Sequence, residues 1–507
     1  MNMSSGNNNN NNGSSNGMPE IGIIGAGMSG LCAAVQLQKK LAITSFTIFE
    51  KNADVGGTWL SNTYPGCACD VASHLYSFSF ELNPTWSENY SAQPEILDYV
   101  KDVARKHRIY EHIKFQHEVK TLTWNDQLKK WIVRYVNASI AKADDETQMF
   151  DIIVMAPGGL RIPHIPSELK AFTGPAMHTA EWNHQIDLKN KRVAVIGSGA
   201  SAVQVIPSIV DDVHTLHCYQ RKPPYIFPRA QFTFPNFMKK IFFYIPFIMW
   251  LYRCMIYVRH ELLHKAFYAG SLFNKLAHTL TKKYRRNELR AHKHLLDDLT
   301  PKYGFGCKRV ILSEQYYGAM TRPNLHVHTS HIDKIVDRTI YTKDGTKEEI
   351  DVLILATGFK VHDYCSPMQI FGKDGQNVLQ AWVDKEPRSY YGIVFSSSPN
   401  LFALLGPNTA LGHSSVIFMI ECQVNFMINA VREMMRRNAR VINLKVEAED
   451  EFMDKLKADL KNTVWNSEDC GSWYVNGRGV ITTLWGDNCT NYWRQTRTTD
   501  WSKFEIK

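Results

Sequence analysis

A glycine motif at residues 25–30, G-A-G-M-S-G, follows the apolar run of residues 21–24 and has the spacing of a phosphate-binding turn. Gly25 permits a tight turn, Gly27 lets the backbone approach a pyrophosphate, and Gly30 allows a helix to pack closely on the preceding strand. The free N–H groups and the positive dipole at the start of that helix attract phosphates. The motif therefore predicts a strand, a turn and a helix that bind a dinucleotide.

A carboxylate and a second turn strengthen the prediction of this first site. Residues 46–49 form the next β-rich run, and Glu50 stands at its end, where a carboxylate accepts hydrogen bonds from the two hydroxyls of a ribose. Gly57, Thr58 and Trp59 follow, and this loop resembles the flavin-facing loop of FAD enzymes. A glycine turn with a packed aromatic ring is the alternative interpretation. We expect the first site to bind FAD.

A second glycine motif, G-S-G-A-S-A at residues 197–202, follows another β-rich run at residues 192–196. Gly197, Gly199 and Ala202 occupy the positions of the three glycines in the first motif. Two such units in one chain imply two bound dinucleotides.

The charge at the end of the following strand indicates which dinucleotide the second unit binds. Residues 213–219 form this predicted strand, and Gln220, Arg221 and Lys222 follow it in place of an acidic residue. A carboxylate there would repel a 2′-phosphate, whereas a cationic pair attracts it and Arg can bind it through two hydrogen bonds. This favours NADPH over NADH, with solvated surface charges as the alternative.

These motifs need a fold that places two nucleotide sites in one chain. At 507 residues and 44% apolar composition, the chain is expected to divide into two or three domains. We predict an α/β fold with two Rossmann-like dinucleotide-binding domains, one for FAD and one for NADPH. The FAD domain would comprise residues 19–165 and 360–507, and the NADPH domain residues 166–359. A helical insertion is predicted at about residues 230–305, with helical spacing across residues 284–299.

The composition excludes some classes of protein. The Asn-rich tail of residues 1–18 has almost nothing to bury and is expected to be disordered. The net charge of +9 comes from scattered Lys and Arg rather than a dense basic run, so we expect no nucleic-acid partner. Ten cysteines at irregular spacing, without a secretory signal, favour reduced thiols in a cytoplasmic protein.

Two groups of potential metal ligands have simpler explanations. Cys67 and Cys69 lie too close in sequence to be half of an ordinary zinc site and are interpreted as packing residues. His326, His328 and His331 could bind a metal, but alternation along a strand explains two of them. We expect no metal.

Residues 241–258, IFFYIPFIMWLYRCMIYV, raise the question of membrane contact. They reach the minimum length of a membrane span, but Pro246 and Arg253 interrupt them and would be costly at the centre of a bilayer. A buried or interfacial helix pair is the main interpretation. Peripheral docking on a membrane and a true span are the alternatives.

Several further segments resemble one family. A linker fingerprint stands just before the second glycine motif and comprises Phe172, Gly174, His178 and Trp182, with Asn183 where Pro or Asp is usual. The other segments are G-G-x-W through Y-P-G to Asp70 (residues 56–70), G-C-K-R (306–309), A-T-G-F (356–359) and G-P-N-T (406–409). An earlier counterpart of A-T-G-F, residues 156–158, has Pro where Thr is usual. Nearly everything beyond the tail is similar to the Baeyer–Villiger monooxygenases, close relatives of the flavin-containing monooxygenases.

The resemblance implies roles for individual residues. Arg309 aligns with the family's active-site Arg, which would stabilise developing negative charge, and Asp70 would pair with Arg309 and hold it in place. His178 would have a positioning part in catalysis, or would be only a hydrogen-bonded residue between domains. The cofactor contacts implied outside the glycine motifs are Trp59, Asp70, Tyr76, Lys308 and Asn408.

The activity implied is that of a monooxygenase in which FAD accepts hydride from NADPH and reacts with O₂ to give a C4a-peroxyflavin. The leading hypothesis is Baeyer–Villiger oxygenation of a hydrophobic small-molecule ketone to an ester or lactone. Oxygenation of an amine nitrogen or a sulfide sulfur is the second hypothesis. The third is an NADPH oxidase or redox-sensing flavoprotein without oxygenase activity.

Overall fold

The first of two parallel five-stranded sheets is built around the first glycine motif. The computed structural model describes residues 18–140, 143–467 and 470–507, so the predicted tail lies almost wholly outside the described residues. The strand order is β19-β7-β1-β2-β3, and every neighbouring pair is parallel. The strands are β1 (Ile21–Ile24), β2 (Phe46–Glu50), β3 (Ile113–Phe115), β7 (Ile152–Met155) and β19 (Leu401–Ala403).

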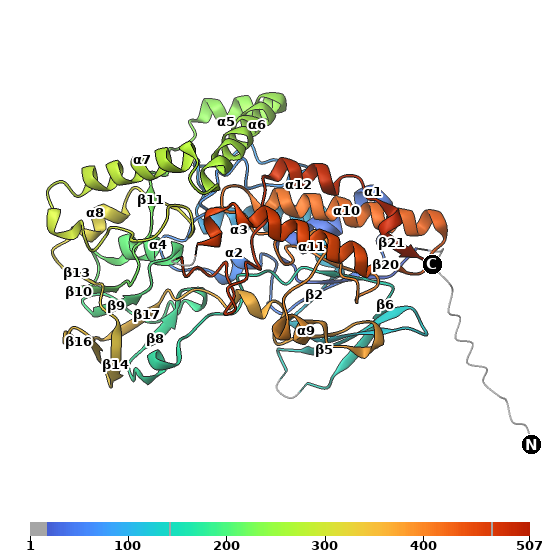
Figure 1. The fold of residues 1–507 in the computed structure, drawn as a ribbon, viewed down its shortest axis with the longest axis horizontal. Coiled ribbons are helices and arrows are strands. Elements are labelled where there is room, and N and C mark those ends of the chain that lie inside the picture. Colours follow the sequence, from blue (N-terminus) through green and yellow to red (C-terminus); the bar gives the residue numbers. More distant parts are fainter. Residues whose placement is uncertain (1–17, 141–142, 468–469) are drawn as a thin grey trace, which may run out of the picture.

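The central strands of this first sheet are apolar on both faces, so helices cover one face and a smaller sheet, which includes residues 130–137, packs on the other. All residues of β1 and β7 are buried. Helix α1 (Met28–Leu41) follows β1 directly and packs against the long helix α10 (Val416–Arg437). Further helices of this half are α2 (Thr58–Ser61), α3 (Gln93–Lys106), α11 (Val446–Lys461) and α12 (Cys489–Thr496). Segments near both ends of the chain therefore share one core (Figure 1).

The second parallel sheet has the order β13-β10-β9-β17-β8. Its strands are β8 (Ala176–His178), β9 (Arg192–Ile196), β10 (Thr215–Tyr219), β13 (Leu325–His328) and β17 (Val352–Leu355). Helix α4 (Ala200–Ile209) follows β9 and packs against α8 (Tyr316–Met320). The strand predicted at residues 213–219 begins two residues later than expected. The fold is α/β with two Rossmann-like units, as predicted.

Smaller sheets and helices complete the molecule. A four-stranded sheet contains β18 (Gln369–Phe371), β4 (His117–Asn125), β5 (Lys130–Asn137) and β6 (Glu146–Phe150), and α9 (Val378–Asp384) packs on it. A three-stranded sheet contains β14 (Ile332–Val336), β15 (Thr339–Thr342) and β16 (Lys347–Glu349). Two-stranded pairs join β11 (Ile226–Phe227) to β12 (Ile311–Leu312), and β20 (Ile442–Leu444) to β21 (Phe504–Ile506).

The predicted helical insertion is present, with one correction. It contains α5 (Asn236–Tyr244), α6 (Pro246–Leu263) and α7 (Leu272–Glu288). The helix expected across residues 284–299 is wrong beyond Glu288, where α7 ends, because Leu289 leaves the helical conformation with φ of −96° and ψ of 16°. Beyond it only a short 3₁₀ turn forms, at Lys293–Leu295.

The apolar segment at residues 241–258 forms two helices. Among the described residues, no one helix has both the length and the apolar character of a membrane span; α5 and α6 reach that threshold only as a pair, and the chain bends by 109° between them. Pro246 is the first residue of α6, and Arg253 is buried. The sequence predicts a buried or interfacial helix pair, and burial is wrong for most of the apolar side chains, which are exposed.

The expectation that all cysteines are reduced is wrong for one pair. Cys307 and Cys470 form a disulfide, and the other eight cysteines are free. The two bonded residues are 163 positions apart in sequence, so nothing in their spacing indicates the pairing. The disulfide joins the loop before β12 to the C-terminal segment.

Candidate active site

One cavity connects the two glycine motifs. Its volume is about 750 Å³, which is within the range of small-molecule sites. It is lined by Gly27 of the first motif, Gly199 of the second, and Arg309. The predicted site residues on its wall are Gly25, Gly27, Glu50, Gly57, Thr58, Trp59, Asp70, Tyr76, Gly199, Lys222, Lys308 and Arg309. Gly30, His178, Gly197, Ala202, Arg221 and Asn408 do not line it.

The first glycine motif has the close contacts that its sequence predicts. Gly25 has φ of +106°, and a Cβ atom there would lie 2.4 Å from the carbonyl oxygen of Ala156. A Cβ atom on Gly30 would lie 1.9 Å from the carbonyl oxygen of Gly25, so only glycine lets α1 pack this closely on β1. Gly27 precedes α1, and no side chain of a described residue caps that helix. Its first N–H groups are therefore available to a phosphate.

Glu50 lies where β2 ends and is held toward the cavity. Its carboxylate accepts hydrogen bonds from the backbone N–H of Ala26 and Asn52, at 2.8 Å each. The side-chain amide of Asn52 donates a third, also at 2.8 Å. These bonds fix the orientation of the carboxylate of Glu50, a residue that is only 4% exposed. The arrangement suits an acceptor for ribose hydroxyls.

The loop after β2 brings two aromatic rings to the cavity wall. Gly57, with φ of +56°, precedes the short helix that begins at Thr58. The indole N–H of Trp59 donates to the hydroxyl of Tyr76 at 3.2 Å, and the two rings meet edge to face. Burial raises the pKa of Tyr76, so its hydroxyl stays protonated at neutral pH. The pair forms a rigid, partly apolar wall for a planar ring system.

The second glycine motif leaves room where a pyrophosphate would lie. A Cβ atom on Gly197, which has φ of +131°, would lie 2.2 Å from the carbonyl oxygen of Ala356. A Cβ atom on Gly199 would meet no described atom within 4 Å. No described side chain caps α4, which begins directly after Gly199. Ala202 is fully buried and contributes only to packing.

Three cations gather beside this second motif. Lys308 is half-buried, and its pKa falls to about 8 because of burial and because of the positive charges of Lys222 and Arg221. Arg221 and Lys222 are exposed at the end of β10. Positive charges so close together favour binding of an anion, which relieves their mutual repulsion. The 2′-phosphate of NADPH is such an anion.

Arg309 and Asp70 form a bidentate ion pair at the cavity wall. Nε and Nη2 of Arg309 donate to the two carboxylate oxygens of Asp70, at 2.7 Å each. The side chains retain 31% and 20% of their exposure. The charge of Asp70 raises the pKa of Arg309, so the guanidinium stays charged. Burial would raise the pKa of Asp70, but the guanidinium outweighs it and the pKa is lowered.

Two residues beside Arg309 carry no signal in the sequence. The carbonyl oxygen of Leu411 accepts a long contact of 3.4 Å from Nη1 of Arg309. Tyr474 is buried, and its pKa rises to about 12 because burial outweighs the opposing charge of Arg309. Its hydroxyl has no hydrogen-bond partner among the described residues. Both come from C-terminal segments that only the fold brings here.

His178 ends β8 and lies behind the cavity wall. Its Nδ1 accepts a hydrogen bond from the backbone N–H of Ala180 at 3.1 Å, and its ring packs edge to face on Phe359. Burial lowers its pKa to about 4, so the imidazole is neutral at pH 7. This geometry supports a positioning role between the linker and the A-T-G-F motif, and not contact with a reacting group.

Asn408 positions backbone and does not reach into the cavity. Its side-chain amide donates to the carbonyl oxygens of Ile481 and Leu484, at 2.9 and 3.2 Å. Its own N–H donates to the carbonyl of Thr482 at 3.0 Å. The neighbours Pro407 and Thr409 do line the cavity. Asn408 therefore shapes the loop that its neighbours present.

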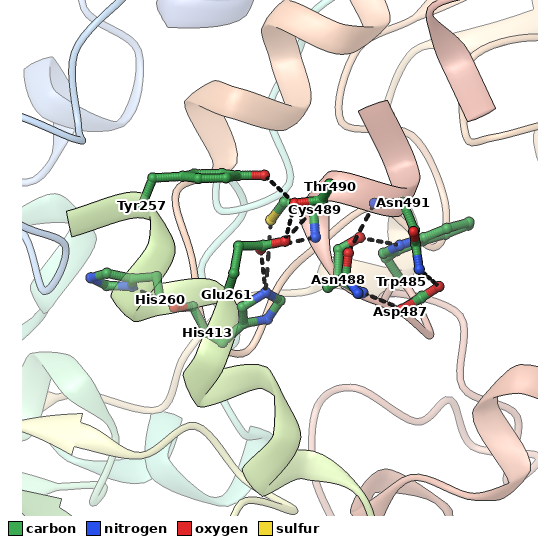
Figure 2. A network of polar contacts seen from close by, with 10 residues as sticks. All are labelled: Tyr257, His260, Glu261, His413, Trp485, Asp487, Asn488, Cys489, Thr490 and Asn491. Atoms are coloured by element: carbon green, nitrogen blue, oxygen red, sulfur yellow. Dashed lines mark hydrogen bonds and ion pairs between the residues drawn. The ribbon is translucent and has the colours of Figure 1, made fainter. Parts of the chain in front are cut away.

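Two groups of potential metal ligands lie away from the cavity wall. His328 of β13 meets His217 of β10, with 3.1 Å between Nε2 and Nδ1, and Glu348 lies close by. Glu261, His413 and Cys489 form the second group (Figure 2). The carboxylate of Glu261 already accepts hydrogen bonds from the backbone N–H groups at the start of α12. Cys67 and Cys69 are buried in the cavity wall itself and belong to neither group.

The residues present fit FAD in the first unit and NADPH in the second. Both helix N-termini lack a side-chain cap from the described residues and face one cavity. Glu50 would supply the ribose acceptor, and the cations around Lys308 would supply the charge for a 2′-phosphate. The cavity runs continuously between these two places, which electron transfer between the two cofactors requires.

Comparisons with known proteins agree with this geometry. The family model described as flavin-binding monooxygenase-like matches residues 19–367. A Baeyer–Villiger monooxygenase of Pseudomonas aeruginosa is 36% identical over 492 residues, covering 96% of this chain and 91% of that protein. The FAD-binding monooxygenase ktnD of Aspergillus niger is 35% identical over 496 residues, covering 96% and 81%.

Solved structures share the architecture. A closed crystal structure of cyclohexanone monooxygenase has a TM-score of 0.83 and 26% identity, covering 97% of this chain and 99% of that one. A structure of OTEMO in complex with FAD and NADP has the same TM-score at 24% identity, covering 96% and 99%. The chain therefore belongs to the flavin-binding monooxygenase-like family and is an FAD- and NADPH-dependent monooxygenase.

Proposed function

We propose that the protein oxygenates an apolar ketone to an ester or lactone, with Arg309 as the residue that stabilises the reacting carbonyl. The observation that carries this proposal is the fixed, charged guanidinium on the wall of the cavity that joins the two nucleotide sites. The reaction consumes one NADPH, one proton and one O₂. One oxygen atom enters the ketone, and the other leaves as water.

When bound, the reduced flavin supplies the activated oxygen. Arg309 then provides positive charge where negative charge develops on the carbonyl oxygen of the substrate, and in many enzymes preorganised charge of this kind contributes more to catalysis than any other single effect. Asp70 occupies Nε and one N–H of Nη2. One N–H of Nη1 makes the long contact with Leu411, and the two that remain, one on each Nη atom, are left for the substrate and the flavin.

Apolar side chains support a hydrophobic substrate. The cavity wall near Arg309 includes Leu411, and elsewhere it includes Val416, Ile420 and Trp473. Such a wall excludes water, which strengthens the charge interactions of Arg309. These contacts favour a ketone whose only strongly polar group is its carbonyl.

The test is product analysis with labelled oxygen. Flavin-loaded protein is supplied with NADPH, ¹⁸O₂ and a panel of apolar ketones, tertiary amines and sulfides. The proposal predicts ketone-stimulated NADPH consumption and an ester or lactone that carries one ¹⁸O atom. Oxygenation confined to amines and sulfides would contradict it, as would hydrogen peroxide release that no substrate changes.

A further inference from the structure

Large apolar side chains are exposed on the helical insertion to an unusual degree. Of the 29 exposed large hydrophobic residues in the described part of the chain, 17 lie between residues 237 and 280. We call this surface the α5–α7 apolar face; examples are Phe243, Phe247, Trp250, Met255, Leu272 and Leu276, each between 50% and 81% exposed. Large exposed apolar patches mark interaction sites. In Figure 1, α5 and α6 project from the body of the molecule.

Helix α6 buries Met249 and Ile256, but polar side chains also hold it in place, and most of its large apolar side chains are exposed. Arg253 donates to the carbonyl oxygen of His74 at 2.6 Å and to the hydroxyl of Ser77 at 3.0 Å. One turn later, the hydroxyl of Tyr257 lies 2.8 Å from that of Thr490. A surface helix usually buries its apolar stripe, whereas α6 leaves most of its large apolar side chains exposed.

The end of α6 is anchored in the same way (Figure 2). Glu261 accepts hydrogen bonds from the backbone N–H groups of Cys489 at 3.1 Å and Thr490 at 2.9 Å. His260 contacts the carbonyl oxygen of His413 through Nδ1 at 2.6 Å. The helix is therefore fixed to the body of the enzyme with its apolar side presented outward.

The charge around this face is almost all of one sign. Within residues 236–288 the only exposed acidic residue is Glu288. The exposed basic residues there are Lys240, Arg259, Lys265, Lys275, Lys282, Lys283 and Arg286. Apolar side chains flanked by Lys and Arg are the composition of helices that lie in the interface of an anionic bilayer.

We infer that the α5–α7 apolar face docks the enzyme on the surface of an anionic lipid membrane. The helices lie in the interface and do not cross it, because the chain bends by 109° between α5 and α6 and Arg253 is bonded to the enzyme body. A second copy of the chain is a poorer occupant. A twofold contact would place this cationic face against itself, and like charges repel.

Vesicle co-sedimentation of the flavin-loaded enzyme tests the inference. The probes are phosphatidylcholine vesicles with and without phosphatidylserine, at low and high salt. We expect wild-type protein to sediment with the anionic vesicles and to be released in part by salt. F247S/W250S and, separately, K282E/K283E should each reduce the bound fraction about tenfold or more. The control V383S/M435S removes exposed apolar side chains elsewhere and should bind as wild type does.

Flavin content and NADPH consumption in the absence of vesicles should be unchanged in all these variants, so the outcome does not depend on the identity of the substrate. Wild-type protein that stays in the supernatant with excess anionic vesicles would overturn the inference. So would a dimer in light scattering that F247S/W250S dissociates while vesicles bind nothing. If F247S/W250S does not fold, the binding of K282E/K283E and the effect of salt on wild-type binding still test the inference. The two lysines are exposed, so their replacement does not disturb packing, and salt leaves the sequence unchanged.

Discussion

Arg309 and Asp70 are 239 residues apart in sequence, and their side chains form two parallel hydrogen bonds of 2.7 Å. The pair holds a permanent positive charge at the wall of the cavity that both nucleotide motifs reach. Because the geometry is bidentate, Lys cannot replace Arg without loss of orientation. Mutations can therefore test the charge of Arg309 and its orientation separately.

Replacement of Arg309 by Ala should leave flavin binding intact and reduce ketone oxygenation about a hundredfold or more, the usual cost of losing a preorganised charge. R309K should keep part of the activity, since the charge remains. The activity of D70N should lie between that of R309A and that of R309K, because Arg309 keeps its charge but loses the carboxylate that positions it. Product formation per NADPH consumed is the measurement. Unaltered ester formation by R309A would remove Arg309 from the mechanism.

Replacement of Arg221 by Ala should raise the KM for NADPH roughly ten- to a hundredfold, which is the range for losing a hydrogen bond to a charged group. The KM for NADH should barely change, since NADH lacks the 2′-phosphate. R322A is a matched control, because Arg322 is also exposed in the second unit but pairs with Asp211. Equal losses for both cofactors in R221A would refute the phosphate assignment.

Lys308 should make NADPH binding dependent on pH. With a pKa of about 8 in the free enzyme, Lys308 is charged below pH 8 and loses its proton as the pH rises through 8. The KM for NADPH should therefore be lowest below pH 8 and increase above it. K308R should flatten this rise, because Arg stays charged. The same alkaline rise in K308R would show that another group is responsible.

Two glycines should respond to the same substitution in different ways. G30A places a Cβ atom 1.9 Å from a backbone carbonyl and should destabilise the fold by about 3 kcal/mol or more, with loss of flavin. G199A meets no described atom within 4 Å, so the protein should fold and bind FAD normally but bind NADPH weakly. Thermal unfolding, flavin content and NADPH titration separate the two. Normal NADPH affinity in G199A would contradict the claim that the second glycine motif binds NADPH.

The glycine motifs made much of the fold predictable. The bounds of β1 and β9 agree with the strands predicted at residues 21–24 and 192–196, because a glycine motif follows each strand directly and ends it. Glu50 also lies at the predicted strand end. Local chemistry determines these features, so a short stretch of sequence is enough to locate them.

Other features depend on contacts that no local pattern encodes. Tyr474 reaches Arg309, and Cys470 reaches Cys307, only after distant segments pack together. Periodicity also does not say which side of a helix faces the core. The apolar run of residues 241–258 predicts a buried or interfacial helix pair without saying which, and α6 turns Arg253 inward and exposes Trp250.

The central claim is that the two glycine-motif units bind FAD and NADPH close enough for hydride to pass from NADPH to the flavin. Anaerobic rapid mixing of the purified protein with NADPH tests it most directly. The account predicts yellow protein whose flavin absorption is lost in a single turnover, faster with NADPH than with NADH. Colourless protein that cannot take up FAD, or bound flavin that NADPH does not reduce, would contradict the account.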